Sequence, residues 1–307
     1  MQLPAEVKRI IEEAAEGVGF VAVKRAAMAL SEGYREGRAA QAGGVERTAA
    51  YLVTRMPATY AAARTVLEEV ASRLRGKAVT SVLDVGAGTG AASLAARACF
   101  PEAALTMLER DRWFAAAARQ IVPEAAQVTM TLPGRLEAHD VVVACYSVGE
   151  MGAAVWRQLW ECARVALVVI EPGTPAGFSL IRGVRDELLG AGARMVAPCP
   201  RETACPMEGG DWCHFAARVE RSSIHRRVKG AALGYEDEKY SYLAVARDGV
   251  EAAGGRIIRR PRQEAGLIVL ETCRPGGLAT ERVTRRDREA FRAARKASWG
   301  DAWGFPS

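Results

Sequence analysis

A glycine-rich turn between an apolar strand and a helix constrains the fold of this chain most. Residues 81–90 read Ser-Val-Leu-Asp-Val-Gly-Ala-Gly-Thr-Gly, and the flanking pattern predicts a strand over residues 79–85 and a helix over 91–99. The glycines permit a tight turn and let a ligand approach the backbone, toward which the first amides of the helix point. The pattern therefore predicts a site for a nucleotide-type ligand.

Two ligands fit this turn. NAD is a competitor, because the glycine spacing also satisfies the dinucleotide pattern with Ala91 as its last small residue. S-adenosylmethionine is favoured, because Asp84 inside the strand and the compact Gly-Ala-Gly-Thr-Gly turn resemble the first motif of the methyltransferases that use it. Glu109 ends the next expected strand, where an acidic side chain binds ribose hydroxyls. The predicted donor site consists of Asp84, Gly86, Ala87, Gly88, Gly90, Glu109 and Tyr146, the last at the expected tip of the fourth strand.

Strands and helices alternate through the middle of the chain, which predicts an α/β fold with a parallel sheet. We expect a Rossmann-like class I methyltransferase sheet over residues 76–195, binding S-adenosylmethionine. A helical region is expected before it, over 1–75, and a cysteine-rich, metal-binding and basic RNA-contacting region after it, over 196–307. Within these regions, residues 126–132 are expected to form a strand and residues 198–238 to be irregular.

The fourth strand, expected over residues 140–146, ends without a recognisable acceptor motif. Enzymes that methylate base amino groups usually carry Asn or Asp followed by two prolines there, and this chain does not. Cys145 is near the position of the nucleophile of carbon-5 pyrimidine enzymes, although Ala144 stands where they have proline. A buried strand cysteine is more often a core residue, so the catalytic residues stay unassigned.

Three cysteines within fifteen positions, Cys199, Cys205 and Cys213, lie in a stretch without strand or helix periodicity. Such a stretch has no core of its own, so a bound metal would stabilise it. The fourth ligand is either Cys273, which also lies in a loop-like setting, or His214. Four thiolates suit an iron–sulfur cluster or zinc, and the spacing does not decide between them. A site with four thiolates has no open position, which indicates a structural metal.

Basic residues are concentrated near the end of the chain. The formal net charge is +6, and residues 256–296 hold 12 Lys and Arg against 5 Asp and Glu. Arginine dominates, and its planar guanidinium binds phosphate and stacks on bases. The sequence therefore predicts a nucleic-acid contact here, with a merely solvated arginine-rich face as the alternative.

The chain shows no long apolar run and no basic, apolar secretory start. Acidic residues occur early, at Glu12, Glu13 and Glu16, which argues against an acid-poor transit peptide. These features predict a cytoplasmic protein without membrane contact.

Several sequence blocks together resemble the methyltransferase-like proteins of the mitochondrial small ribosomal subunit and their bacterial relatives. The blocks, spread over about residues 48–275, are 50–52 with 55–60, 83–90, 146–151, 171–178, 199–215 and 235–242. The resemblance implies a Rossmann-like methyltransferase domain associated with assembly of the small subunit. It also implies a 4Fe–4S cluster on Cys199, Cys205, Cys213 and Cys273.

Two functions remain open. In the first, the protein is an S-adenosylmethionine-dependent methyltransferase acting on small-subunit ribosomal RNA. In the second, it is a non-catalytic assembly factor that binds RNA and retains the methyltransferase fold. The assembly-factor hypothesis is retained because the sequence predicts a complete donor site but shows no acceptor motif.

Overall fold

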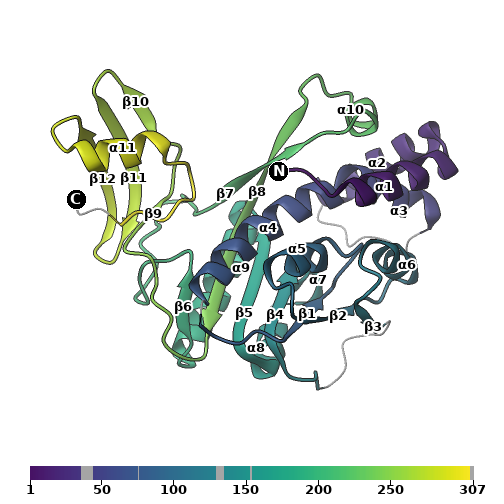
Figure 1. Ribbon diagram of the computed structural model, residues 1–307, viewed down its shortest axis with the longest axis horizontal. Coiled ribbons are helices and arrows are strands. Elements are labelled where there is room, and N and C mark those ends of the chain that lie inside the picture. Colours follow the sequence, from purple (N-terminus) through teal and green to yellow (C-terminus); the bar gives the residue numbers. More distant parts are fainter. Residues whose placement is uncertain (36–43, 75, 129–134, 153, 305–307) are drawn as a thin grey trace.

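The structure is a computed structural model that describes residues 1–35, 44–74, 76–128, 135–152 and 154–304 (Figure 1). Its helices are α1 (Ala5–Val18), α2 (Phe20–Arg35), α3 (Val45–Thr54), α4 (Met56–Arg73), α5 (Ala91–Cys99), α6 (Arg112–Ile121), α7 (Val148–Met151), α8 (Val155–Cys162), α9 (Pro175–Gly190), α10 (Ser223–Lys229) and α11 (Arg288–Lys296). Its strands are β1 (Ser81–Val85), β2 (Ala104–Leu108), β3 (Ala126–Val128), β4 (His139–Cys145), β5 (Ala163–Pro172), β6 (Arg194–Ala197), β7 (Phe215–Glu220), β8 (Tyr235–Ala246), β9 (Arg256–Ile257), β10 (Arg262–Glu264), β11 (Leu267–Arg274) and β12 (Gly277–Thr284).

The main sheet has the strand order β3-β2-β1-β4-β5-β8-β6, and β7 also pairs with β8. The first five strands in this order are parallel to one another, and β8 is antiparallel to its neighbours. The α/β class with a parallel sheet is therefore confirmed. The strand order reverses direction between β1 and β4, and ligands of such sheets bind outside the carboxyl ends of the strands at this point.

Both faces of the sheet are buried, which explains the continuous apolar runs of its central strands. Along β4, Val141 and Val143 face a core shared with α1–α6, while Val142 and Ala144 face a second core shared with α8 and α9. The result is a three-layer arrangement with helices packed against the sheet (Figure 1).

The N-terminal helices are held by more than the sheet. Helix α10, at the tip of the long β7–β8 hairpin, packs against α2 and α3. The backbone N–H of Glu220 on β7 also donates to the carbonyl of Met1 at 3.2 Å.

No helix among the described residues is long and apolar enough to span a membrane.

A second, smaller sheet forms a lobe at the upper left of Figure 1. It consists of β10-β11-β12 with β9 paired to β11, and α11 covers it. Its core contains Ile257, Ile268, Leu270 and Trp303 together with Ala290 and Ala294 of α11.

The expectation of an irregular segment over residues 198–238 is wrong for its second half. Residues 215–220 form β7 and residues 223–229 form α10, and the next strand begins at 235 rather than 240. The signal was present, because Phe215, Ala217 and Val219 alternate with less buried residues along β7. Of the strand expected over 126–132, residues 126–128 form β3 and residues 129–132 lie outside the described part.

Candidate functional site

The glycine turn lies where β1 ends and α5 begins, and its glycines have left-handed backbones. Gly86, Gly88 and Gly90 have φ of +72°, +56° and +83°. A Cβ atom on Gly86 would lie 2.5 Å from the Cβ of Ser147, so this position requires glycine. A Cβ on Gly88 would meet no atom within 4 Å, so the space beside it is open. The turn thus packs tightly on the segment after β4 at one residue and leaves room for a ligand at another.

Buried polar atoms next to the turn lack hydrogen-bond partners. One carboxylate oxygen of Asp84 accepts from the Ser93 hydroxyl at 2.7 Å. The other oxygen of Asp84 and the hydroxyl of Thr89 are buried without a partner in the described part of the chain. Burial raises the pKa of Asp84 to about 6. Since unsatisfied buried polar atoms are uncommon in native proteins, these atoms fit a turn that is completed by a ligand.

Glu109 is buried at the edge of the turn and is fixed by two backbone amides. Its Oε2 accepts from the N–H of Gly88 at 2.7 Å, and its Oε1 accepts from the N–H of Asp111 at 2.7 Å. A carboxylate oxygen can accept more than one hydrogen bond, so Glu109 retains capacity for ribose hydroxyls. The geometry brings the predicted acid to the glycine turn as expected.

Tyr146 follows β4 and has a left-handed backbone with φ of 57°, which is strained for a residue with a side chain. Its neighbour Ser147 donates to the carbonyl of Val85 at 2.7 Å, so the backbone of this segment adjoins the turn. The side chain of Tyr146 is engaged elsewhere, because its hydroxyl donates to Glu238 Oε1 at 3.0 Å. Arg55 pairs with the same oxygen at 3.2 Å. Sequence reasoning did not assign roles to Glu238 and Arg55.

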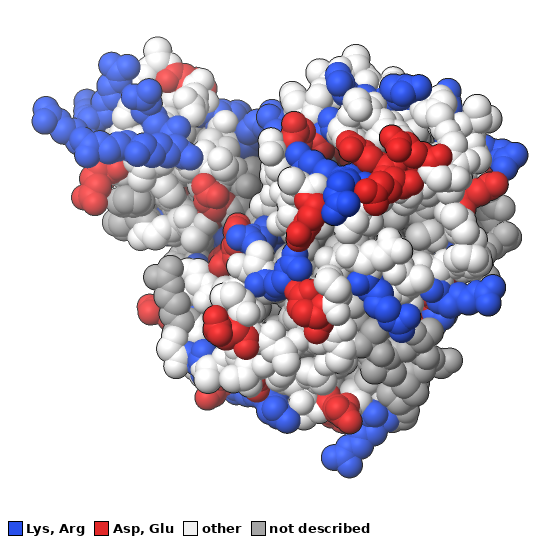
Figure 2. Space-filling view, turned by 45° about the vertical axis from the view of Figure 1, so that its right-hand side comes forward, with Lys and Arg blue, Asp and Glu red and all other residues white. Residues whose placement is uncertain are grey.

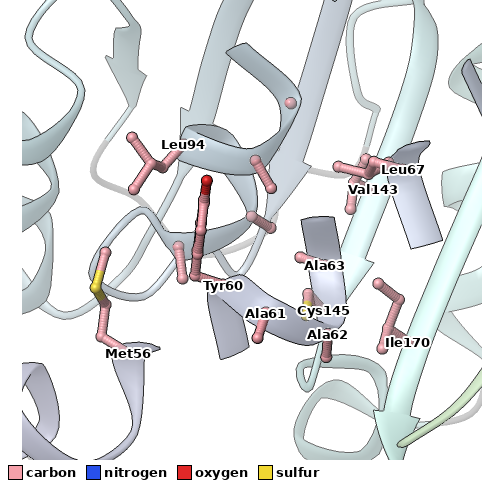
Figure 3. Close-up of a cluster of buried hydrophobic side chains, with 14 of the residues drawn as sticks. Met56, Tyr60, Ala61, Ala62, Ala63, Leu67, Leu94, Val143, Cys145 and Ile170 are labelled. Carbon is pink, nitrogen blue, oxygen red and sulfur yellow. The ribbon is translucent and has the colours of Figure 1, made fainter. Parts of the chain in front are cut away.

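Cys145 lies in the core rather than in the candidate site. It belongs to the buried cluster of Figure 3 with Ala62 and Ala63 of α4 and Ile170 of β5. Burial raises the pKa of the Cys145 thiol well above its usual range, so the sulfur stays protonated. A protonated, enclosed thiol is a poor nucleophile, and the core interpretation of this cysteine therefore fits the structure.

The four predicted metal-binding cysteines line one cavity. Cys199, Cys205 and Cys213 come from the connection between β6 and β7, and Cys273 comes from β11 of the lobe. The cavity has a volume of about 40 Å³, more than the roughly 10–15 Å³ that one water requires. All four thiols are free. Across the described residues, no group of three or more His, Cys, Asp or Glu side chains is arranged to hold a metal ion.

His214, the alternative fourth ligand, is engaged with aromatic rings. Its ring stacks on Trp212 at 5.1 Å between centroids and meets the edge of Trp299 at 4.8 Å. It is not among the residues that line the cavity. The geometry thus groups Cys273, rather than His214, with the other three cysteines.

The cavity thiols are close enough to affect one another electrostatically. Burial raises the pKa of Cys213 well above its usual range, and the other three cavity cysteines raise it further. Burial likewise raises the pKa of Cys273 to about 12. Four thiolates could therefore be held here only with positive charge between or around them.

Arg256 is the first residue of the basic segment predicted to contact nucleic acid, but its side chain does not lie at the surface. Its side chain is only 2% exposed and pairs with Glu69 of α4. The guanidinium also donates to the carbonyls of Pro198 at 2.9 Å and Gly300 at 2.8 Å. Because its cross-strand neighbour is Cys273, Arg256 connects α4, the cysteine connection and the lobe.

The variant Arg256→Met is expected to lower the free energy of unfolding by about 2–4 kcal/mol, because it breaks a buried ion pair and leaves the carbonyls of Pro198 and Gly300 without this donor, while Glu69 keeps Arg73 as a partner. Urea denaturation measures this change. Arg262→Met on the same lobe, where the side chain is 67% exposed, should change stability by less than about 0.5 kcal/mol. Equal effects of the two variants would contradict the structural role of Arg256.

Seven other basic residues of the lobe form an exposed face, shown in blue at the upper left of Figure 2. We call this set the basic face; it consists of Arg282, Arg285, Arg286, Arg288, Arg292, Arg295 and Lys296. Among the described residues, none of the seven has an acidic side chain as an ion-pair partner. Their charge is therefore available to an external anion.

The comparison with protein families decides which family these features belong to. A family model described as "Mitochondrial small ribosomal subunit Rsm22" matches residues 45–304. This chain belongs to the Rsm22 family. The resemblance to the methyltransferase-like proteins of the small ribosomal subunit is thereby confirmed. The glycine turn, the four cysteines and the basic face all lie within the matched segment, while α1 and α2 precede it.

Two curated relatives illustrate the family. The human "Ribosome assembly protein METTL17, mitochondrial" is 25% identical over 296 residues, covering 82% of this chain and 61% of that protein. "Rsm22-cox11 tandem protein 2, mitochondrial" of Schizosaccharomyces pombe is 25% identical over 319 residues, covering 82% and 42%. This Rsm22-family chain thus spans less than two thirds of the length of either relative.

The expectation of a cytoplasmic protein is wrong by this comparison. The description of the Rsm22 family names the mitochondrial small ribosomal subunit, and both relatives are named as mitochondrial proteins. The expectation depended on the composition of the first residues, and that composition does not determine where the protein is located.

Solved methyltransferase structures are also similar to this chain. Magnesium protoporphyrin IX methyltransferase from Synechocystis, with bound S-adenosylmethionine, has a TM-score of 0.42 at 14% identity, over 72% of this chain and 91% of that one. Precorrin-6y C5,15-methyltransferase from Geobacter metallireducens has a TM-score of 0.39 at 18% identity, over 61% and 87%. These scores are low, so the assignment of the fold rests on the strand order itself.

Proposed function

We propose that this Rsm22-family chain is an S-adenosylmethionine-binding, methyltransferase-like protein that acts on or with small-subunit ribosomal RNA. The observation that carries the proposal is the turn at the sheet's switch point, with unpartnered polar atoms on Asp84 and Thr89 beside it. The proposal includes a helical region over 1–75, a donor-binding region over 76–195 and a cluster-binding, RNA-contacting region over 196–307.

In this proposal the donor lies along the glycine turn, with its ribose hydroxyls on Glu109 and its methyl group toward the tip of β4. The sulfonium of S-adenosylmethionine supplies an activated methyl group, so transfer depends mainly on alignment of the two reactants. Calorimetric titration of the purified protein with S-adenosylmethionine and with NAD tests the donor. Heat from NAD and none from S-adenosylmethionine would refute this part of the proposal.

We also propose that Cys199, Cys205, Cys213 and Cys273 hold a structural 4Fe–4S cluster, with zinc as the alternative. The support is that four free thiols line one cavity and that arginines lie beside it. Much of the remaining lining is apolar, including Phe178, Ile181 and Ile258, and an apolar surrounding limits the access of water to a bound cluster. A group bound here would join the lobe to the main sheet, because Cys273 belongs to the lobe.

The basic face is proposed to contact ribosomal RNA. Reversing the charge of Arg285, Arg286 and Arg288 to glutamate is expected to weaken binding to small-subunit ribosomal RNA at least tenfold near 0.1 M salt. It should also reduce the slope of log affinity against log salt by about 2–3, because each lost phosphate contact removes about 0.7–0.9. Filter binding over a salt series measures both quantities.

The matched control reverses three exposed arginines outside the lobe, Arg9, Arg119 and Arg157. This control keeps the change in net charge identical and is expected to leave the salt slope within about one unit of the wild-type slope. If both triple variants bind RNA equally, the basic face is only a solvated surface.

A second candidate function is an assembly factor that binds the small subunit without transferring methyl groups. It is favoured by the acceptor end of the site, where Cys145 is an enclosed thiol and the Tyr146 hydroxyl is held by Glu238. Label transferred from the donor into ribosomal RNA would exclude it.

A further inference from the structure

Two arginine side chains are buried against the cysteine cavity. Arg185 of α9 is 3% exposed and Arg256 of β9 is similarly enclosed, and both line the cavity. A buried guanidinium is costly unless its charge is compensated and its N–H groups are hydrogen-bonded. The two differ in what compensates them.

Arg256 pairs with Glu69 of α4, a carboxylate that Arg73 also contacts at 3.2 Å. The Arg256 guanidinium forms two contacts with the Glu69 carboxylate, and its other donors reach backbone carbonyls. Its positive charge therefore has a carboxylate partner within the protein, and its contacts connect segments around the cavity.

Arg185 lacks an equally buried partner. Its ion pair is with Asp186, whose carboxylate is half-exposed. Its Nη2 donates to the carbonyls of Arg201 at 3.0 Å and Thr203 at 2.6 Å, in the loop between Cys199 and Cys205. The Arg185 side chain and Cys199 line the same cavity. Its Nε is buried without a hydrogen-bond partner in the described residues. Arg185 thus fixes the loop between Cys199 and Cys205 by hydrogen bonds and places a positive charge beside the cavity.

We propose that Arg185 is the residue that compensates the negative charge of an iron–sulfur cluster on the four cysteines, and so raises its reduction potential. The proposal rests on the proposed cluster. A cluster with four thiolates is anionic, and one-electron reduction adds a further negative charge. A fixed cation beside a ligand sulfur therefore favours the reduced state, as hydrogen bonds and charge near sulfur do in general.

The test compares anaerobically purified wild-type protein with Arg185→Met and Arg185→Lys. Iron and acid-labile sulfide are measured first, and a dithionite titration followed by electron paramagnetic resonance then gives the potential. In Arg185→Met the ratio of reduced to oxidised cluster at a fixed potential is expected to fall about tenfold, which is 59 mV for one electron. Arg185→Lys, which keeps the charge, should stay closer to wild type.

Arg194→Met is the control, because Arg194 lies on the neighbouring β6 but is 57% exposed; its potential should equal that of wild type. An unchanged potential in cluster-bearing Arg185→Met overturns the inference alone. If Arg185→Met loses the cluster altogether, retention of the cluster in Arg185→Lys supports the role of the positive charge. Equal loss of the cluster in both variants overturns that role. Wild-type protein without iron and sulfide overturns the proposed cluster and the inference with it.

Discussion

Replacing Gly88 by arginine is expected to abolish binding of S-adenosylmethionine, with a loss of affinity of roughly a hundredfold or more. Gly88 has a left-handed backbone and open space where a Cβ would lie. A long side chain there would occupy the space over the turn in which we place the donor. Its N–H is also bound to Glu109, so movement of the backbone would displace the acid proposed to bind the ribose. Isothermal titration calorimetry measures the loss.

Gly230→Arg is the control that distinguishes loss of the donor site from the strain of placing a side chain on a left-handed backbone. Gly230 follows α10 with φ of +60° and also has no atom within 4 Å of a Cβ position, but it lies away from the turn. The two variants should therefore unfold at similar temperatures while only Gly88→Arg loses donor binding. Wild-type affinity in folded Gly88→Arg would mean that the donor does not occupy this turn.

Replacing Cys213 by serine is expected to lower the iron content from about four atoms per chain to a small fraction of that value. Thiolates bind iron in such clusters much better than a serine hydroxyl does. The three cysteines of the β6–β7 connection lie in a segment with little regular structure, so the unfolding temperature should fall together with the iron content. Iron and sulfide assays and thermal unfolding of anaerobically purified protein measure both effects.

Cys99→Ser is the control, because Cys99 is a half-buried residue of α5 and does not line the cavity. It should retain the iron of the wild-type protein. If wild-type protein instead contains one zinc and no iron, the zinc alternative replaces the cluster. If Cys213→Ser and wild type bind the same amount of metal, the cavity is not the metal site.

The features that the sequence predicted best are local ones. The strand before Gly86 and the helix over residues 91–99 follow directly from apolar runs and glycine spacing, and α5 begins and ends where expected. The position of Glu109 beside the turn could also be predicted, because this residue directly follows the next strand, β2. Local patterns of this kind determine the turn, because the residues that form it are neighbours along the chain.

The features that the sequence did not predict depend on contacts between distant residues. The hydrogen bonds of Glu238 connect it with Tyr146 and Arg55, which are 92 and 183 positions away. Arg256 looked like part of a basic surface because several of its neighbours in sequence are arginines, and only the fold shows that its side chain is buried and paired with Glu69. Charge counts along a chain do not separate a paired guanidinium from an exposed one.

The measurement that tests the central claim most directly uses isotope-labelled S-adenosylmethionine and small-subunit particles from cells lacking this protein. Cluster-intact protein is incubated with both, and the particles are separated by sedimentation. We predict that wild-type protein sediments with the particles and carries labelled donor, and that Gly88→Arg sediments without label. Label fixed covalently in the ribosomal RNA would identify the enzyme, and bound donor without transfer would identify the assembly factor. Wild-type protein that neither sediments with the particles nor binds the donor would contradict the account.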